Sequence, residues 1–160
     1  MEDFILYKTF QSGGKVSLMT GLDKTSSDYN DLISIACCFA RIGKEVKVLA
    51  PVHYKDPAYS RVFGALIGTR YERKCPDLLI DGVFFEYESY SRSFTPGKLS
   101  DMLTRGSLQS DSIIIDMRDT SIQHHHIKRQ IINKLRDPSF KRSITRVWSF
   151  NGQAITEEWK

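Results

Sequence analysis

The chain has 160 residues, of which 41% are hydrophobic and 26% are charged, and its formal net charge is +4. This composition is typical of a globular domain with a real core, and no apolar run is long enough to cross a membrane, so we expect no membrane partner. Three cysteines do not make a disulfide framework, which excludes the small disulfide-rich secreted class. We therefore expect a cytoplasmic protein, and the basic charge favours an anionic partner only weakly.

The first part of the chain predicts a hairpin, a helix and a strand. Residues 4–20 alternate around a Ser-Gly-Gly turn, which indicates an opening hairpin. A Ser or Asp at 26–28 can cap a helix that runs to Arg41, and residues 45–50 then predict a strand. The segment 51–73 contains scattered Pro and Gly, and we expect irregular structure there with a short apolar turn.

The middle of the chain predicts a hairpin that carries three carboxylates. Asp81-Gly82 between two apolar runs is typical of a two-residue type I′ turn, which fixes the register. Asp77 is then opposite Glu86, and alternation places both on one face with Glu88. Like charges opposite each other are destabilising, so a divalent ion or basic side chains must compensate them. The other face is expected in the core: Leu78, Ile80, Val83, Phe85 and Tyr87.

The last part of the chain predicts two helices and two further strands. Thr95-Pro96 starts a helix to about 105, since Thr is a good cap and Pro suits the first helical position. Residues 112–117 form a continuous apolar run, as in a strand covered on both faces. Thr120 or Ser121 can cap a helix to about 136, and residues 143–156 predict a hairpin around Asn-Gly.

The order of these elements predicts an α/β fold. We expect one three-layer-like domain over 1–160, with a mixed central sheet and flanking helices. Its parts are an N-terminal hairpin at 4–20, a core at 28–150 and a C-terminal hairpin at 143–156.

The central hairpin also resembles a known nuclease motif. Pro76-Asp77, followed by Glu86-Tyr87-Glu88, is similar to the PD-(D/E)xK motif of restriction-endonuclease-like nucleases. Together with the preceding helix and strand, it resembles the C-terminal toxin domain of contact-dependent growth inhibition proteins (CdiA), which cleave tRNA. The similarity covers roughly residues 28–150, and its specific part is the hairpin.

This resemblance implies a restriction-endonuclease-like fold and metal-dependent hydrolysis of phosphodiester bonds in nucleic acid, with tRNA or another RNA as substrate. Asp77 and Glu86 would bind Mg²⁺ or Mn²⁺, and Asp31 or Asp28 would complete the site. An inhibitor of the immunity type would be a further partner.

One position departs from the motif. Where the family has Lys, this chain has Glu88, which cannot supply a positive charge, so Glu88 would bind a second metal ion or act as a base. Lys74 or Lys98 would have to take the role of the missing Lys. The alternative is a catalytically degenerate module on the same fold that binds nucleic acid or protein.

Basic residues in two regions are candidates for binding nucleic acid. Arg70 and Arg73 precede the hairpin, and Lys128, Arg129 and Lys134 lie on the last predicted helix. Such a run is usually a solvated helix face; if the protein is a nuclease, it would follow the phosphate backbone.

His124-His125-His126 suggests a metal site, but consecutive helical residues point in different directions and do not chelate one ion. We expect the exposed start of a helix. One of these histidines acting as a general acid/base in a metal-free ribonuclease is a third hypothesis, which EDTA would separate from the first.

Overall fold

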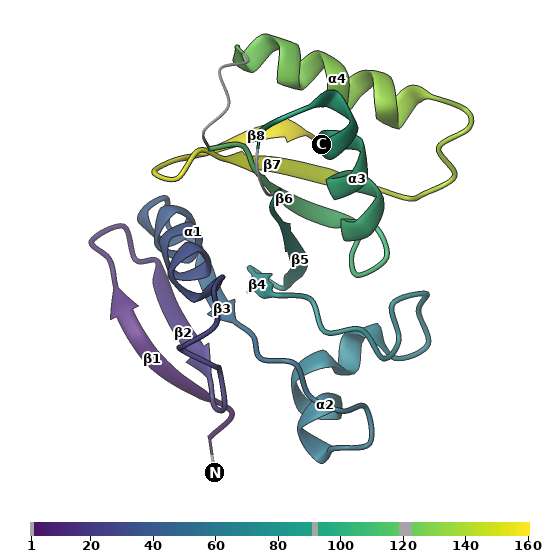
Figure 1. Ribbon diagram of the computed structural model, residues 1–160. Coiled ribbons are helices and arrows are strands. Elements are labelled where there is room, and N and C mark those ends of the chain that lie inside the picture. The colour runs from purple at the N-terminus through teal and green to yellow at the C-terminus, as the bar shows by residue number, and fades with distance from the viewer. Residues whose placement is uncertain (1, 91–92, 119–122) are drawn as a thin grey trace. The chain divides into compact units, whose positions relative to one another are not determined.

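The computed structural model shows a mixed α/β fold, as the sequence predicts (Figure 1). It describes residues 2–90, 93–118 and 123–160. Within these residues, every helix is too short or too polar to cross a lipid bilayer.

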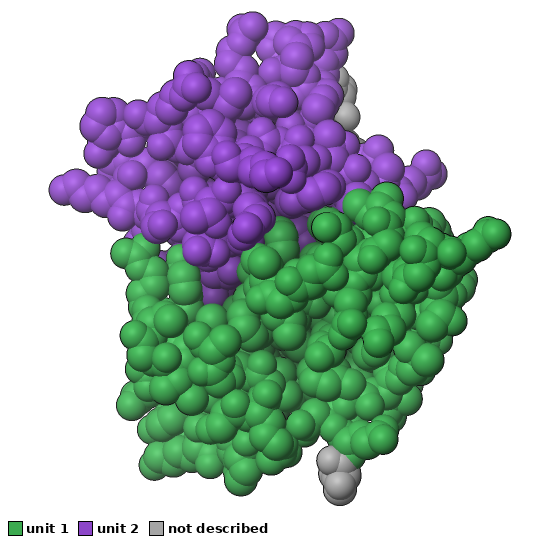
Figure 2. All heavy atoms as spheres, turned by 180° about the vertical axis from the view of Figure 1, so that it is seen from behind, with its two compact units in different colours: residues 1–85 green, residues 86–160 purple. Residues whose placement is uncertain are grey.

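The chain divides into two compact units (Figure 2). Unit 1 comprises residues 1–85 and unit 2 comprises residues 86–160. Strand β5 (Val83–Glu88) begins in unit 1 and ends in unit 2. The prediction of a single domain over 1–160 stays a prediction.

Unit 1 contains a mixed sheet. Its strands are β1 (Phe4–Thr9), β2 (Lys15–Met19), β3 (Glu45–Val48), β4 (Leu78–Ile80) and the first part of β5. Strands β2 and β3 pair in parallel, whereas β1–β2, β3–β4 and β4–β5 are antiparallel. The predicted opening hairpin is therefore confirmed.

The turn of the central hairpin has the predicted conformation. Asp81 has φ +46° and Gly82 has φ +80°, as a type I′ turn requires. The Asp81 carboxylate also accepts a hydrogen bond from the Glu45 backbone N–H at 2.8 Å, which ties the turn to β3. The predicted register is confirmed from Ile80↔Val83 to Leu78↔Phe85, where the ladder between β4 and β5 ends.

Helices cover both faces of the sheet in unit 1. Helix α1 (Tyr29–Arg41) packs on β2, β3 and β4, and the ring of its Phe39 lies 6.1 Å from that of Phe85. The neighbouring Phe84 instead stacks on Phe63 of α2 (Pro57–Phe63), with ring centroids 5.9 Å apart. Because adjacent strand residues point to opposite faces, α1 and α2 lie on opposite sides. Unit 1 by itself has three layers.

Helix α2 corrects the expectation of irregular structure in 51–73. The Asp56 side chain accepts a hydrogen bond from the Ala58 backbone N–H at 2.9 Å, and Pro57 occupies the first helical position. This pairing of a cap with Pro is a helix-start signal. The helix has only seven residues, which makes its apolar periodicity hard to recognise. A 3₁₀ turn (Gly64–Leu66) follows it.

Unit 2 contains the end of β5 with β6 (Ser112–Asp116), β7 (Arg146–Phe150) and β8 (Ile155–Trp159). Strands β5, β6 and β7 are parallel, and β8 returns antiparallel to β7. All residues of β6 are buried, as its continuous apolar run predicts.

Two helices pack on one face of the sheet in unit 2. Helix α3 (Pro96–Gly106) begins at the predicted Thr95 cap, whose hydroxyl accepts the Lys98 backbone N–H. Helix α4 (His124–Arg136) begins after Gln123, and the predicted caps at 120–121 lie outside the described residues. The shared core joins both helices to β6 and β7: Leu99, Met102, Leu103, Ile113, Ile115, Met117, Ile127, Ile131 and Val147.

Candidate functional site

Two predicted metal ligands belong to unit 1. Asp31 lies in the first turn of α1, and Asp77 directly precedes β4; both are half-buried. Helix α1 ends at Arg41, and Gly43 (φ +89°) turns the chain into the start of β3. Because α1 packs back along β2, β3 and β4, its first turn lies toward the carboxyl end of β3. Strand β4 begins at that same end, where the Asp77 carbonyl accepts the Leu49 backbone N–H. Both carboxylates therefore lie toward one end of the sheet.

The other predicted carboxylates belong to unit 2. Glu86 and Glu88 pair in register with Ile113 and Ile115 of β6, and paired residues of parallel strands share a face. That face is the one covered by α3 and α4. The assignment of Asp77 and Glu86 to one metal site rests on sequence and stays a prediction.

Glu88 has a basic partner on α3. Its side chain is 15% exposed, and its carboxylate lies 3.3 Å from Nε of Arg105. A Cβ at Gly106 would lie 3.2 Å from Cγ of Glu88, so the small residue makes room for the glutamate. The negative charge of Glu88 is thus compensated within unit 2.

A polar cavity of about 340 Å³ lies beyond the carboxyl end of β5. Its lining comprises Ser89, Tyr90, Lys98, Asp101 and Arg105. Arg105 donates a hydrogen bond to the Ser89 carbonyl at 3.0 Å, and Nζ of Lys98 lies 5.7 Å from the Tyr90 ring centroid. With two cations and one carboxylate, the cavity suits an anionic group such as phosphate. The carboxyl ends of parallel strands are the usual place for such a site.

Sequence reasoning considered Lys98 but missed Asp101 and Arg105. These three residues are spaced i, i+3 and i+7, which places them on one face of a helix. That spacing was the available signal, and the opposite face of α3 carries the apolar core residues.

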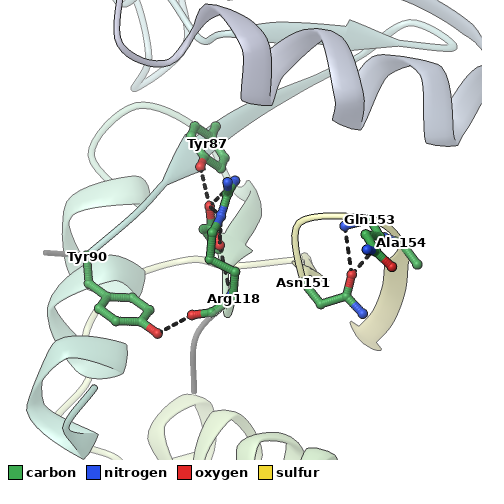
Figure 3. Close-up of polar contacts among 7 residues, drawn as sticks. Tyr87, Tyr90, Arg118, Asn151, Gln153 and Ala154 are labelled. Atoms are coloured by element: carbon green, nitrogen blue, oxygen red, sulfur yellow. Dashed lines mark hydrogen bonds and ion pairs between the residues drawn. The ribbon is translucent and has the colours of Figure 1, made fainter. Parts of the chain in front are cut away.

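A buried carboxylate organises the carboxyl end of β6. Asp116 accepts hydrogen bonds from the Tyr87 hydroxyl at 2.6 Å and from Nε of Arg118 at 2.8 Å (Figure 3). The Tyr90 hydroxyl in turn donates to the Arg118 carbonyl. The network holds Tyr90 where it lines the cavity.

The turn after β7 is closed by one side chain. The Asn151 side-chain oxygen accepts the backbone N–H groups of Gln153 and Ala154 at 2.9 and 2.8 Å (Figure 3). Gly152 has φ +94°, which explains why glycine follows Asn in this predicted turn.

His124 is the first residue of α4 and pairs with a buried glutamate. Its Nε2 contacts Oε1 of Glu158, and the Ser149 hydroxyl donates to the same oxygen at 2.8 Å. The carboxylate stands between Ser and His, so the imidazole does not contact the hydroxyl as a Ser-His nucleophile would require. Among the described residues, no group of three His, Cys, Asp or Glu is placed to hold a metal ion.

The remaining predicted residues lie on two surfaces. Lys128 and Arg129 are exposed on α4, while Nζ of Lys134 lies 4.9 Å from the Phe140 ring centroid. In unit 1, Arg70 and Arg73 are both exposed.

Lys74 is half-buried in unit 1, and its backbone carbonyl accepts a hydrogen bond from the Tyr59 hydroxyl at 3.0 Å. Burial raises the pKa of Tyr59, so its hydroxyl stays a donor across the physiological range. The backbone at Lys74 is therefore anchored to α2.

Comparison with solved structures finds a shared fold. A chain of the CdiA-CT/CdiI toxin and immunity complex from Burkholderia pseudomallei superposes with a TM-score of 0.54. The two chains are 18% identical, and the match covers 88% of this chain and 91% of that one. No family model and no curated protein matches this chain. The likeness shows the fold.

Proposed function

We propose that this protein is a nuclease that hydrolyses phosphodiester bonds of RNA with the help of Mg²⁺ or Mn²⁺. The observation that carries the proposal is the cavity beyond β5, which Lys98 and Arg105 line and where Arg105 pairs with the carboxylate of Glu88. Cations of this kind bind phosphate oxygens, and neighbouring carboxylates are what metal-assisted hydrolysis needs.

The chemistry of the expected ligands suits the proposed metal. By the spacing of the sequence motif, Asp77 and Glu86 are the expected ligands. Asp31 was the expected third ligand, but the described residues contain no group of three such side chains placed around one ion, so the proposal relies on two carboxylates. Carboxylate oxygens suit Mg²⁺ and Mn²⁺, and Mg²⁺ commonly takes only one or two carboxylates and keeps several waters. When bound, such an ion supplies Lewis acidity and a water of lowered pKa.

The side chains of unit 2 have separate roles in this proposal. Arg105 and Lys98 bind the phosphate, and Glu88 holds Arg105 in position through its ion pair. This gives Glu88 a positioning role in place of the base that the sequence suggested. Lys128 and Arg129 on α4 follow the backbone of the RNA at longer range.

A second candidate function is a catalytically inactive module that binds nucleic acid. The Glu88–Arg105 ion pair favours it, because a paired guanidinium is a less available cation than the Lys of the motif. The two candidates make the same prediction for binding and different predictions for cleavage.

A protein inhibitor of the immunity type is the further partner that we propose. The structural neighbour belongs to a toxin and immunity complex, which supports this proposal. A cytoplasmic site of action would suit an RNA substrate.

The decisive experiment combines metal titration with cleavage. Mg²⁺ and Mn²⁺ are titrated by calorimetry into the wild type and the Asp77→Ala/Glu86→Ala variant, and tRNA and plasmid cleavage are followed with and without EDTA. We expect binding and RNA cleavage in the wild type, loss of both in the variant, and no effect of Glu157→Ala, an exposed carboxylate on β8. RNA binding without metal binding or cleavage would favour the inactive module, and cleavage that survives EDTA would favour a metal-free ribonuclease.

A further inference from the structure

An exposed aromatic ring in unit 1 lies among basic side chains. Tyr54 is 38% exposed. Cζ of Arg73 lies 4.3 Å from its ring centroid, Nζ of Lys55 lies 5.9 Å away, and the His53 ring lies 4.6 Å away with an interplanar angle of 31°. We propose that these four residues, here named the Tyr54 stack, bind an unpaired base of single-stranded RNA.

The Tyr54 stack is built on an anchored backbone. Its residues come from the segment after β3 and from the turn before β4. The thiol of Cys75 donates to the Val52 carbonyl at 3.4 Å, and the buried Tyr59 of α2 donates to the Lys74 carbonyl. These bonds fix both segments to the body of unit 1, so the rings and the guanidinium are held in place before a ligand arrives.

Arg73 adopts a backbone conformation that arginine rarely takes. Its φ is +70°, in the left-handed region, where a side chain other than glycine costs free energy. The Lys74 backbone N–H donates to the Tyr71 carbonyl at 3.0 Å and closes the turn around Arg73. This turn places the guanidinium beside Tyr54, and stored strain of this kind often marks a ligand site.

The chemistry of the stack matches an unpaired base and its phosphate. Bases stack on aromatic rings and on guanidinium planes, and Lys55 adds a cation for the backbone. A base inside a duplex is already stacked on its neighbours, so the stack selects single strands. It also follows the carboxyl end of β3, the end of the sheet at which Asp77 lies. The inference rests on the proposed function, because it takes RNA as the ligand and adds that the bound part of the RNA is single-stranded.

The test measures binding of a short fluorescently labelled single-stranded RNA by anisotropy, in EDTA so that nothing is cleaved. We expect Tyr54→Ala to weaken binding roughly 5- to 150-fold, the range for loss of one stacked base. Tyr54→Phe should bind like the wild type, because the ring remains. Tyr7→Ala is the matched control, since Tyr7 is also an exposed tyrosine of unit 1, at 48%, but lies on β1.

A second variant separates binding from folding. Glycine adopts a positive φ without strain, so Arg73→Gly should fold at least as well as the wild type and still lose affinity. An RNA that carries 2-aminopurine gives a direct signal, because stacking on the ring quenches its fluorescence. We expect quenching with the wild type and Tyr54→Phe, and much less with Tyr54→Ala.

The outcomes distinguish this inference from the proposed function. If the wild type binds single-stranded RNA but Tyr54→Ala and Arg73→Gly bind it equally well, the Tyr54 stack is refuted while the nuclease proposal stands. If Tyr54→Ala weakens the binding of duplex RNA as much as that of single-stranded RNA, the Tyr54 stack does not select unpaired bases and the inference fails. Absence of any RNA binding by the wild type would overturn both.

Discussion

The two units of the chain handle polar groups in opposite ways. Every buried Ser, Asp or Glu in the described residues belongs to unit 2: Ser107, Ser110, Ser112, Asp116, Ser149 and Glu158. In the described part of unit 1 the charged side chains are half-buried or exposed, and those of the Tyr54 stack lie at the surface. A buried polar group needs an internal partner, whereas an exposed cation can exchange water for a ligand.

This difference separates structural polar residues from candidate functional ones. Asp116 and Glu158 lie near strand ends, where functional residues are often found, but their hydrogen bonds go to side chains of the same unit. Lys98 and Arg105, which line the cavity, are instead accessible to a ligand. Position at a strand end is therefore a weaker indicator than access to solvent.

Removing the Asp116 carboxylate should give the largest loss of stability. Asp116→Ala leaves Tyr87 without its acceptor and Arg118, which is 34% exposed, without its counter-charge. We expect the free energy of unfolding to fall by about 3 kcal/mol, measured by urea denaturation. Asp28→Ala is the control in unit 1; Asp28 is exposed and its side chain makes no cap hydrogen bond, so a change of about 0.5 kcal/mol at most is expected. Equal effects of both substitutions would contradict the contrast between the units.

Unit 1 should be most sensitive to steric change where backbones approach closely. A Cβ at Gly14 would lie 1.9 Å from the Ala40 carbonyl oxygen, and backbone atoms cannot move aside easily. Gly14→Ala should therefore cost about 2–3 kcal/mol in the same assay. Gly64→Ala is the matched control, because nothing lies within 4 Å of its Cβ position and its φ is −57°. If Gly14→Ala leaves stability unchanged, α1 does not pack this closely on the residue that precedes β2.

The contrast between buried and exposed polar groups can be tested within β8, where the buried Glu158 follows the exposed Glu157. Glu158→Ala removes the acceptor of the buried Ser149 hydroxyl and the partner of His124, and leaves a small cavity. We expect a loss of about 2 kcal/mol, read from the urea midpoint. The adjacent Glu157 is exposed, and Glu157→Ala should change stability by no more than about 0.5 kcal/mol. If both variants behave alike, Glu158 does not hold α4 to β8.

The smallest predicted effect is a pH dependence of the stability that the Asp3–Arg61 ion pair contributes in unit 1. The Arg61 side chain donates hydrogen bonds to Asp3 at 3.0 Å and holds the pKa of that carboxyl below its ordinary value of 3.8. A lowered pKa in the folded state contributes stability above the ordinary value, and this contribution is lost as pH falls through the folded value. Arg61→Ala should therefore lower the urea midpoint slightly near about pH 6 and leave it unchanged near about pH 2. A deficit that persists in acid would assign the effect to packing by the Arg61 side chain.

Much of the fold was predictable because its signals are local. The Asp81-Gly82 turn fixed the hairpin register, and alternation placed Leu78, Ile80 and Phe85 in the core. The helix that begins after Thr95 followed from its cap and Pro96. Helix α2 escaped notice because a two-turn helix offers little periodicity.

The candidate site was less predictable because its contacts join distant segments. From the sequence, Glu88 and Lys98 were candidate site residues. Glu88 was expected to bind a second metal ion or to act as a general base. Only the packing of α3 on β6, the neighbour of β5, brings Arg105 to Glu88 and forms the cavity. Arg73 was predicted to bind nucleic acid, but its ring partner Tyr54 lies in a separate loop.

By itself, the sequence determined most elements of this protein, with the short helix α2 as the exception, since capping, turn conformation and side-chain alternation depend on neighbours within a few residues. It also determined where carboxylates and cations are concentrated along the chain. Tertiary structure decided which charged side chains pair with one another. Side chains from separate elements come into contact only when the apolar faces of those elements pack together. The buried network around Asp116, the Glu88–Arg105 ion pair and the Tyr54 stack all arise at that stage.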